Sequence, residues 1–163
     1  MEKVYVLVAN SERRLSSFIE SLVLDACFGH ACVEATRVVR VDELIKLGSS
    51  GAYQLVIVVA DNLLPGPVLR SPWVSADEAV QAIREIRSQC DTPLIAVAVF
   101  PGDEASLLEA GAECVVRLPF EAEQLRSEVR RVLRLADRVE EPKPSGWSLN
   151  DLLWRGWRRL KSA

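Results

Sequence analysis

The sequence has a single histidine, His30, and its four cysteines form no Cys-x-x-Cys pair. Zinc sites draw on clusters of these two residue types at short spacing, so the sequence gives no indication of such a site. No Ser-His or Cys-His pair for nucleophilic catalysis is apparent either. We therefore expect no enzymatic activity and interpret the cysteines as small buried side chains in a reducing compartment, namely Cys27, Cys32, Cys90 and Cys114.

Long apolar runs and an excess of basic residues are also missing. The apolar run near the N-terminus is too short for a secretory signal or a membrane-spanning helix, so we expect a cytoplasmic protein. A formal net charge of -3 disfavours wholesale binding of nucleic acid. The residues after the first apolar run, Ala9-Asn10-Ser11-Glu12, contain no glycine-rich loop, which excludes a dinucleotide or P-loop phosphate cradle there.

The sequence does have a regular alternation of two apolar patterns. Apolar runs of strand length predict strands over residues 4–9, 55–60, 94–100 and 114–116, and the mixed, β-branched segment 31–39 predicts a further strand. Between and after them, apolar residues at helical spacing predict helices over 11–26, 41–47, from 75, over 103–110 and around 125–136. This order predicts an α/β fold: a doubly wound, five-stranded parallel sheet of the flavodoxin-like type, followed by a C-terminal amphipathic helix.

Chemistry in such a sheet gathers at the carboxyl ends of the strands, and the motifs there resemble those of one family. The strongest strand, 55–60, is followed by Asp61 and then by Pro65-Gly66. Gly111-Ala112 and Leu118-Pro119-Phe120 lie around the fifth strand. Together these motifs resemble the CheY-like receiver domains of bacterial response regulators, over roughly residues 3 to 136. The resemblance implies a (βα)5 receiver fold with Asp61 at the phosphoacceptor position.

The sequence departs from this family at four other functional positions. Asn10 and Ser11 replace the acidic pair that holds Mg²⁺, an ion that requires hard oxygen ligands. Glu12 is one residue beyond that pair, and we expect it inside the first helical turn. Ala98 replaces a hydroxyl residue, and Leu118 replaces the lysine that pairs with the phosphate. Arg117 is a poor substitute, because neighbouring residues of a strand point to opposite faces.

These departures suggest that the phosphorylation chemistry has been lost. Asp61 is then a vestigial phosphoacceptor whose carboxylate caps a turn, although an altered ligand role for it stays open. Our hypothesis is a phosphorylation-independent pseudo-receiver that binds other signalling proteins or a second copy of itself, without a Mg²⁺ cofactor. The alternative is a stand-alone response regulator that is phosphorylated on Asp61.

The connection after Asp61 is longer than such connections usually are. It contains Pro67, Pro72 and Trp73. Two interpretations of Trp73 remain open: it packs down on Leu69 and plugs the former phosphorylation site, or it is an exposed aromatic anchor for a partner.

The composition changes after the fifth helix, which predicts a receiver-like domain over residues 1–137 and a proline-containing linker over 138–147. Residues 148–163 are predicted to form a basic, tryptophan-rich amphipathic helix. This helix could fold back on its own domain or on a second copy, dock into a partner groove, or touch a membrane surface weakly. Its interaction candidates are Trp147, Trp154, Trp157, Arg155 and Arg158.

The predicted fifth helix is rich in arginine. Receivers bind partners through the face made by helix four, strand five and helix five, and the resemblance carries this expectation over. The simpler interpretation is a solvated face on which acidic residues such as Glu123 and Glu128 balance the arginines. The arginines concerned are Arg126, Arg130, Arg131, Arg134 and Arg138.

Overall fold

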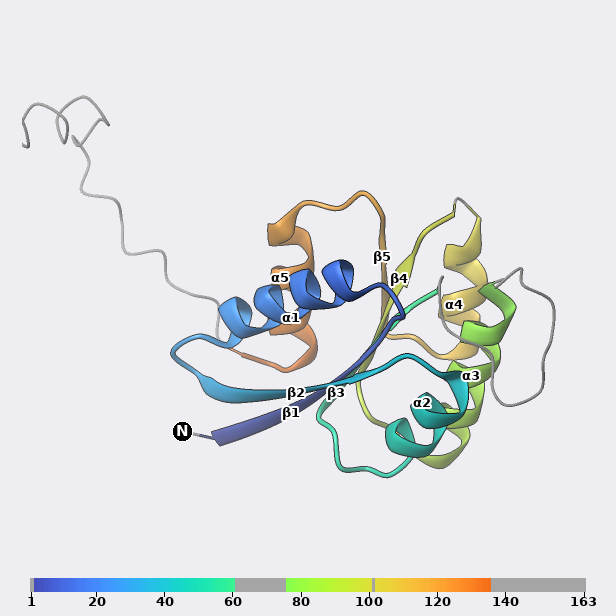
Figure 1. The fold of residues 1–163 in the computed structure, drawn as a ribbon, viewed down its shortest axis with the longest axis horizontal. Helices are drawn as coiled ribbons and strands as arrows, with labels where there is room; N and C mark the ends of the chain where they lie inside the picture. The colour runs from blue at the N-terminus through green and yellow to red at the C-terminus, as the bar shows by residue number, and fades with distance from the viewer. Residues whose placement is uncertain (1, 61–75, 101, 136–163) are drawn as a thin grey trace, which may run out of the picture.

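A computed structural model describes residues 2–60, 76–100 and 102–135 of the chain (Figure 1). Five strands form one parallel sheet in the order β2-β1-β3-β4-β5. Their bounds are β1 Glu2–Ala9, β2 Ala31–Val38, β3 Leu55–Val59, β4 Leu94–Ala98 and β5 Cys114–Arg117. The helices between and after them are α1 Arg13–Cys27, α2 Val41–Gly48, α3 Ala76–Gln89, α4 Asp103–Ala110 and α5 Ala122–Val132.

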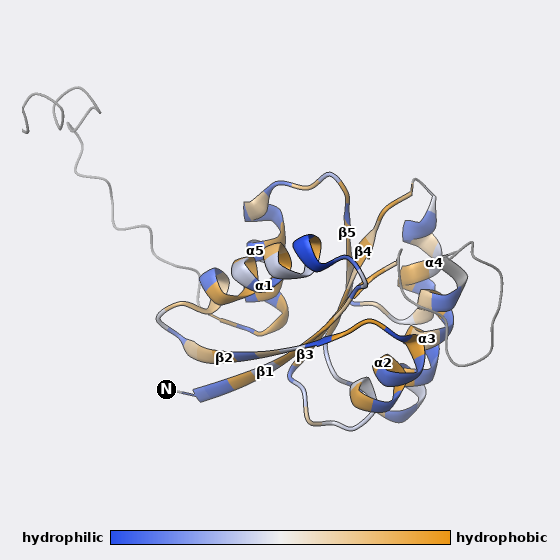
Figure 2. Ribbon diagram, viewed as in Figure 1, coloured by the Kyte–Doolittle hydropathy of each residue, from blue (hydrophilic) through white to orange (hydrophobic). Residues whose placement is uncertain are grey.

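Helices cover both faces of the sheet, as the continuous apolar strands predict. All residues of β3 and β4 are buried, and these strands lie at the apolar centre of the molecule in Figure 2. Successive residues of β3 serve opposite faces: Ile57 packs towards α1 and α5, whereas Val56 and Val58 pack towards α2, α3 and α4. The predicted doubly wound sheet is therefore confirmed.

The predicted element order is also confirmed, and the differences in bounds have physical causes. Helix α1 begins at Arg13 rather than Ser11, because Glu12 is its N-cap. Strand β4 ends at Ala98, two residues before the predicted end. Gly48 was expected to follow α2, but it is the last residue of that helix. A Cβ atom there would lie 2.7 Å from Cδ1 of Ile86, so this glycine lets α2 approach α3 closely.

The cysteine prediction is correct for two of the four residues. Cys27 and Cys114 are buried, and Cys90 is half-buried. Burial raises the pKa of the Cys27 thiol, and it raises the pKa of Cys114 to about 12. The prediction is wrong for Cys32, which is exposed because it lies on β2, the edge strand of the sheet.

None of the helices that the structure describes is long and apolar enough to cross a lipid bilayer. The predicted linker 138–147 and the predicted helix 148–163 lie outside the described residues, as do Asp61, Trp73 and Ser75, the expected start of α3.

Candidate functional site

The loop after β1 begins with Asn10, whose side chain is completely buried. Its amide group closes a small ring with the loop's own backbone: Nδ2 donates to Glu12 O at 3.3 Å, and Oδ1 accepts from Glu12 N at 3.2 Å. The backbone N–H of Asn10 donates to Val38 O of β2 at 3.0 Å. Both polar groups of this amide are thus used to shape the loop.

Glu12 was expected inside the first turn of the helix, but it lies one position earlier as the N-cap of α1, in an extended conformation. Its Oε1 accepts from the backbone N–H of Arg14 at 3.0 Å, and its Oε2 accepts from that of Leu15. The bond from Leu15 and then the bond from Arg14 lower the pKa of the Glu12 carboxyl below its ordinary value. This carboxylate therefore holds the helix N-terminus with both of its oxygens.

A residue that the sequence analysis did not single out lies over the same loop. Arg37, near the end of β2, donates from Nη2 to Ser11 O at 3.0 Å and from Nε to Asn10 O at 3.4 Å. The parallel register pairs Val8 with Arg37, so the guanidinium is brought next to the end of β1. A register for the pair of strands, drawn from the sequence, could have revealed this contact.

The carboxyl ends of β4 and β5 carry apolar side chains. Ala98 is completely buried at the end of β4, and its carbonyl accepts a hydrogen bond from Leu118 N at 2.8 Å. The Leu118 side chain packs against the core between the sheet, α1 and α5. Arg117, on the other face of β5, is exposed and lies 3.8 Å from Glu104 of α4. The expectation that Arg117 cannot replace a lysine at position 118 agrees with this placement.

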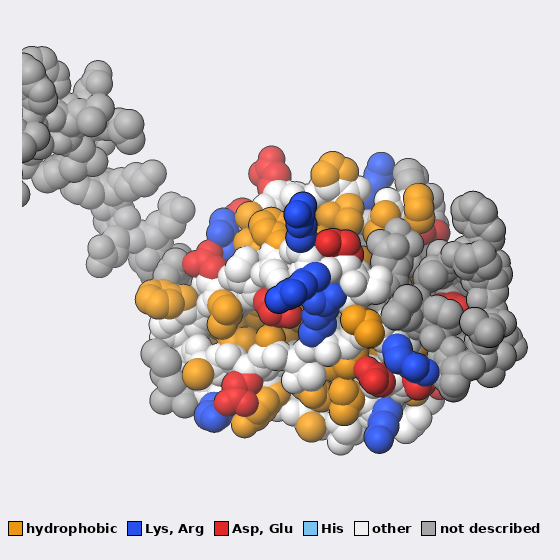
Figure 3. All heavy atoms as spheres, in the orientation of Figure 1, with side chains coloured by type: hydrophobic (Ala, Val, Ile, Leu, Met, Phe, Trp, Pro, Cys, Tyr) orange, Lys and Arg blue, Asp and Glu red, His pale blue; other side chains and the backbone are white. Residues whose placement is uncertain are grey.

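The described side chains at this edge do not fit a Mg²⁺ ion. Magnesium is held by hard, negatively charged oxygen ligands with near-octahedral geometry. Asn10 supplies no charge, the Glu12 carboxylate is committed to the helix N-terminus, and Arg37 adds a positive charge. Figure 3 shows Lys and Arg side chains gathered near the start of α1. Within residues 2–60, 76–100 and 102–135, no cluster of three His, Cys, Asp or Glu side chains could hold a metal.

His30 precedes β2, and so it lies at the end of the sheet opposite to these residues, as expected. Asp61, which would complete the edge after β3, is outside the described residues. The same is true of the interaction candidates Trp73, Trp147, Trp154, Trp157, Arg155 and Arg158.

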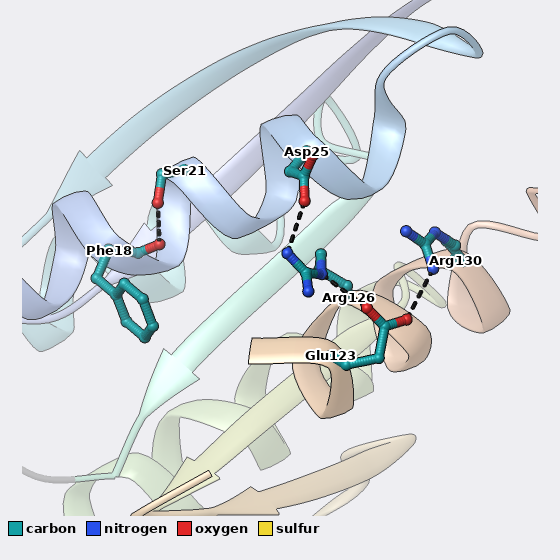
Figure 4. Close-up of polar contacts among 6 residues, drawn as sticks. All are labelled: Phe18, Ser21, Asp25, Glu123, Arg126 and Arg130. Carbon is teal, nitrogen blue, oxygen red and sulfur yellow. Dashed lines mark hydrogen bonds and ion pairs between the residues drawn. The ribbon is translucent and has the colours of Figure 1, made fainter. Parts of the chain in front are cut away.

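The arginines of α5 form ion pairs along the contact between α1 and α5 (Figure 4). Arg126 donates from Nη1 to Asp25 of α1 at 2.7 Å and from Nε to Glu123 at 2.9 Å. Arg130 donates to the other oxygen of Glu123 at 3.0 Å. Arg126 and, to a smaller extent, Arg130 lower the pKa of the Glu123 carboxyl below its ordinary value.

Arg131 forms a further ion pair with Glu128 at 2.7 Å. The expectation that acidic neighbours balance the arginines of this helix is thus confirmed for Arg126, Arg130 and Arg131. Arg138 lies outside the described residues.

No protein-family model matches the sequence, and no curated protein matches it either. The structure, by contrast, matches many solved receiver domains. One is the receiver domain of a sensor histidine kinase from Pseudomonas aeruginosa PAO1, crystallised with a magnesium ion in its active-site cleft. It is 20% identical with a TM-score of 0.61, and the match covers 81% of this chain and 98% of that one.

Two further solved structures show the same likeness. A putative response regulator from Chloroflexus aurantiacus is 15% identical with a TM-score of 0.63, over 82% of this chain and 99% of that one. The receiver domain of NtrX from Brucella abortus is 18% identical with a TM-score of 0.62, over 80% and 99%. At such identities the likeness concerns the fold, and at that level the resemblance to receiver domains is confirmed.

Proposed function

We propose that this chain is a receiver domain of bacterial two-component signalling that works as a protein-interaction module in the cytoplasm, without phosphorylation. The receiver fold supports the first half of this proposal. The second half rests on one observation: the guanidinium of Arg37 is bound to the loop at which receivers hold their metal ion.

The physical reason is electrostatic. Transfer of a phosphoryl group to an aspartate needs a cation that neutralises charge on the phosphoryl oxygens, and a metal ion with an open coordination position normally provides it. Here Arg37 occupies its donors on backbone carbonyls, while Asn10 and Glu12 are engaged within the loop. A divalent cation that approached this loop would meet the positive charge of Arg37. The carboxylate of the described loop, that of Glu12, already accepts two backbone hydrogen bonds.

The other two positions support the same proposal. At the ends of β4 and β5, Ala98 and Leu118 offer neither a hydroxyl nor an ammonium group to a phosphoryl oxygen. A binding function requires only the fold and its surfaces, whereas a phosphorylation switch requires these side chains. We therefore propose a binding module and no catalytic role.

The test is a titration with Mg²⁺ and beryllofluoride, a mimic of the phosphoryl group, followed by backbone NMR. The proposal predicts that the amide signals of Asn10, Ala98 and Leu118 do not move at millimolar concentrations. Shifts of these signals that disappear in Asp61→Asn would overturn it in favour of a genuine response regulator that uses Asp61.

A gain-of-function variant makes a negative result informative. It combines Asn10→Asp, Ser11→Asp, Ala98→Thr and Leu118→Lys with Arg37→Gln. These changes restore the acidic pair, the hydroxyl and the lysine of a receiver, and they remove the guanidinium from the loop. We expect this variant to respond to beryllofluoride and to lose the response when Asp61→Asn is added. A response of equal size in the unaltered chain would show that the departures from the family do not matter.

A further inference from the structure

Strand β2 is one edge of the sheet, and no strand of the described residues lies beyond it. It is eight residues long, contains no proline, and pairs with β1 residue by residue without a bulge. The strand at the other edge, β5, has four residues. Proteins shorten, charge, bulge or cover an edge strand that must not pair with another chain. A long and regular edge such as β2 is therefore a surface to which a further strand can add.

The backbone groups that point outwards belong to alternate residues of β2. The carbonyl of Val38 accepts from the backbone N–H of Asn10, so Val38 directs its backbone groups towards β1. Because this direction alternates along a strand, residues 33, 35 and 37 direct their N–H and C=O groups away from the sheet. Within the described part of the chain, these outward groups have no backbone hydrogen bond. Ala35 is exposed, so the middle of this edge is accessible.

The two charged side chains of β2 do not protect this edge. Arg37 lies over the loop after β1, where it donates to the carbonyls of Asn10 and Ser11. Glu34 is bound to Lys3 of β1, with 2.7 Å between Oε1 and Nζ, so its charge is balanced within the same molecule. Charged side chains prevent pairing when they stand free at an edge. Here both are bound on the side of β1, and the outer side of the strand lacks this protection.

A second copy of β2 fits this edge in one antiparallel register. Two copies related by a two-fold axis pair residues whose numbers have an even sum, because residues opposite each other point to the same face of the sheet. The two longest such registers pair residues 31–37 or residues 32–38 with the same residues of the other copy. The first places Glu34 directly opposite Glu34, and like charges in that position repel. The second places Ala35 opposite Ala35 and Glu34 opposite Thr36, with no like charges opposed.

We propose that this chain forms a dimer through its β2 edges, which pair antiparallel with Ala35 on the two-fold axis. The outward backbone groups of each copy then bond to those of the other. The hydroxyl of Thr36 faces the carboxylate of Glu34 of the second copy. A single pair of strands buries less surface than a standard protein interface, so the dimer is weak and reversible. It names a partner and a surface that the proposed function leaves open, and it does not depend on phosphorylation of Asp61.

Sedimentation equilibrium of the full chain from micromolar to millimolar concentration tests this proposal. We expect a dimer whose population rises with concentration. Ala35→Lys should raise its dissociation constant roughly five-fold or more, because it places two ammonium groups opposite each other on the axis. Thr36→Lys is the matched control. It adds the same charge one residue further on, but opposite Glu34 of the second copy, so it should lower the dissociation constant roughly five-fold.

Disulfide trapping then locates the axis. The background variant is Cys32→Ser, since Cys32 is the exposed cysteine of the described residues. In this background, Ala35→Cys should give a cross-linked dimer under mild oxidation, because opposite residues of a hydrogen-bonded pair lie about 5.5 Å apart between Cα atoms. Val33→Cys on the same edge should not, because the proposed register places residue 33 opposite residue 37.

Three results would overturn the proposal. A chain that stays monomeric at millimolar concentration would show that β2 does not pair with a second copy. Equal effects of the two lysine substitutions on the dissociation constant, or no effect of either, would exclude this register of the β2 edges. Cross-linking through Val33→Cys rather than Ala35→Cys would place the axis elsewhere on the strand. Circular dichroism of each variant separates loss of pairing from loss of folding, and both lysine positions are exposed.

Discussion

Arginine side chains hold two parts of this molecule together, but they do so with different partners. At the carboxyl end of β1, Arg37 donates to the neutral backbone carbonyls of Asn10 and Ser11. Between α1 and α5, Arg126 and Arg130 donate to carboxylates. In the first contact the acceptors of the guanidinium are neutral, and the carboxylate of Glu12 is attracted to it only through space. In the second contact each guanidinium is hydrogen-bonded directly to a carboxylate.

This difference in acceptors means that arginine has a different role in each of the two regions. The charge-cancelling pairs of α5 belong to the stability of the helix contact and leave little basic surface for an acidic partner. The guanidinium of Arg37, whose hydrogen-bond acceptors are neutral carbonyls, changes the potential of the loop that shapes the site. Counting arginines along the sequence cannot separate these cases, because the role of each arginine depends on whether its hydrogen-bond acceptor is neutral or charged.

The largest effect is expected from removing the contact at the sheet edge. Arg37→Gln should lower the free energy of unfolding by about 2 kcal/mol, since hydrogen bonds from a charged donor are lost. The partner carbonyls do not titrate, but Arg37 also helps to lower the pKa of the Glu12 carboxyl, so the loss should become slightly smaller as the pH falls through that lowered pKa. Urea unfolding at several pH values measures it. Arg40→Gln, on an exposed pair with Asp42, is the control and should cost far less. Equal losses would contradict this distinction.

Helix α1 begins beside the loop after β1 and ends at the contact with α5. Two serines in this helix allow an unsatisfied buried hydroxyl to be compared with a hydrogen-bonded one. The Ser16 hydroxyl is buried and makes no hydrogen bond. Ser16→Ala should therefore raise the free energy of unfolding by about 1 kcal/mol, because an unsatisfied buried group is removed. Ser21→Ala, in which the hydroxyl is bonded, should not stabilise the protein. Denaturant unfolding of both variants measures the difference, and a loss of stability in Ser16→Ala would show that this hydroxyl has a partner.

The smallest effect is expected from the charge-cancelling region, and it should depend on pH. Arg126 lowers the pKa of Glu123 in the folded protein, so the stabilisation is present above the unfolded pKa of about 4.3. It is lost as the pH falls through the lower folded value. Glu123→Gln should reduce the melting temperature by about 2 °C at pH 7, the size typical of an exposed ion pair in a domain of this length.

The two melting curves should converge as the pH falls below 4. A constant difference between Glu123→Gln and the parent over this range would mean that the carboxylate charge does not contribute to the contact between α1 and α5.

The fold could be predicted because its signals are local and repeated. Runs such as Leu55–Val59 and Leu94–Ala98 are apolar on both faces, which is the pattern of a buried parallel strand, and the helices between them carry clear stripes. The exact helix start was missed at Glu12, because a glutamate is an uncommon N-cap and only its two backbone hydrogen bonds reveal the role.

For the candidate site, the sequence predicted which side chains are missing but not which contacts are present. Asn10 directly follows the apolar run of β1. Ala98 and Leu118 were placed at the ends of β4 and β5 by the resemblance to receivers, and the structure has them there. Arg37 was missed because its contact joins two strands through their register, and no pattern within β2 marks it. Long-range pairing of this kind becomes visible only when the strands are placed side by side.

The reactivity of the two buried thiols can measure how often the domain opens locally. Cys27 and Cys114 both belong to the core between the sheet, α1 and α5, whereas Cys90 packs against the core on the other face. A thiol reacts as its thiolate, and burial with a raised pKa suppresses that form for Cys27 and Cys114. Modification of these two thiols must therefore wait for α1 or α5 to leave the sheet, while exposed Cys32 reacts at once. The lag between them, measured with a thiol reagent, reports how often this side of the native state opens.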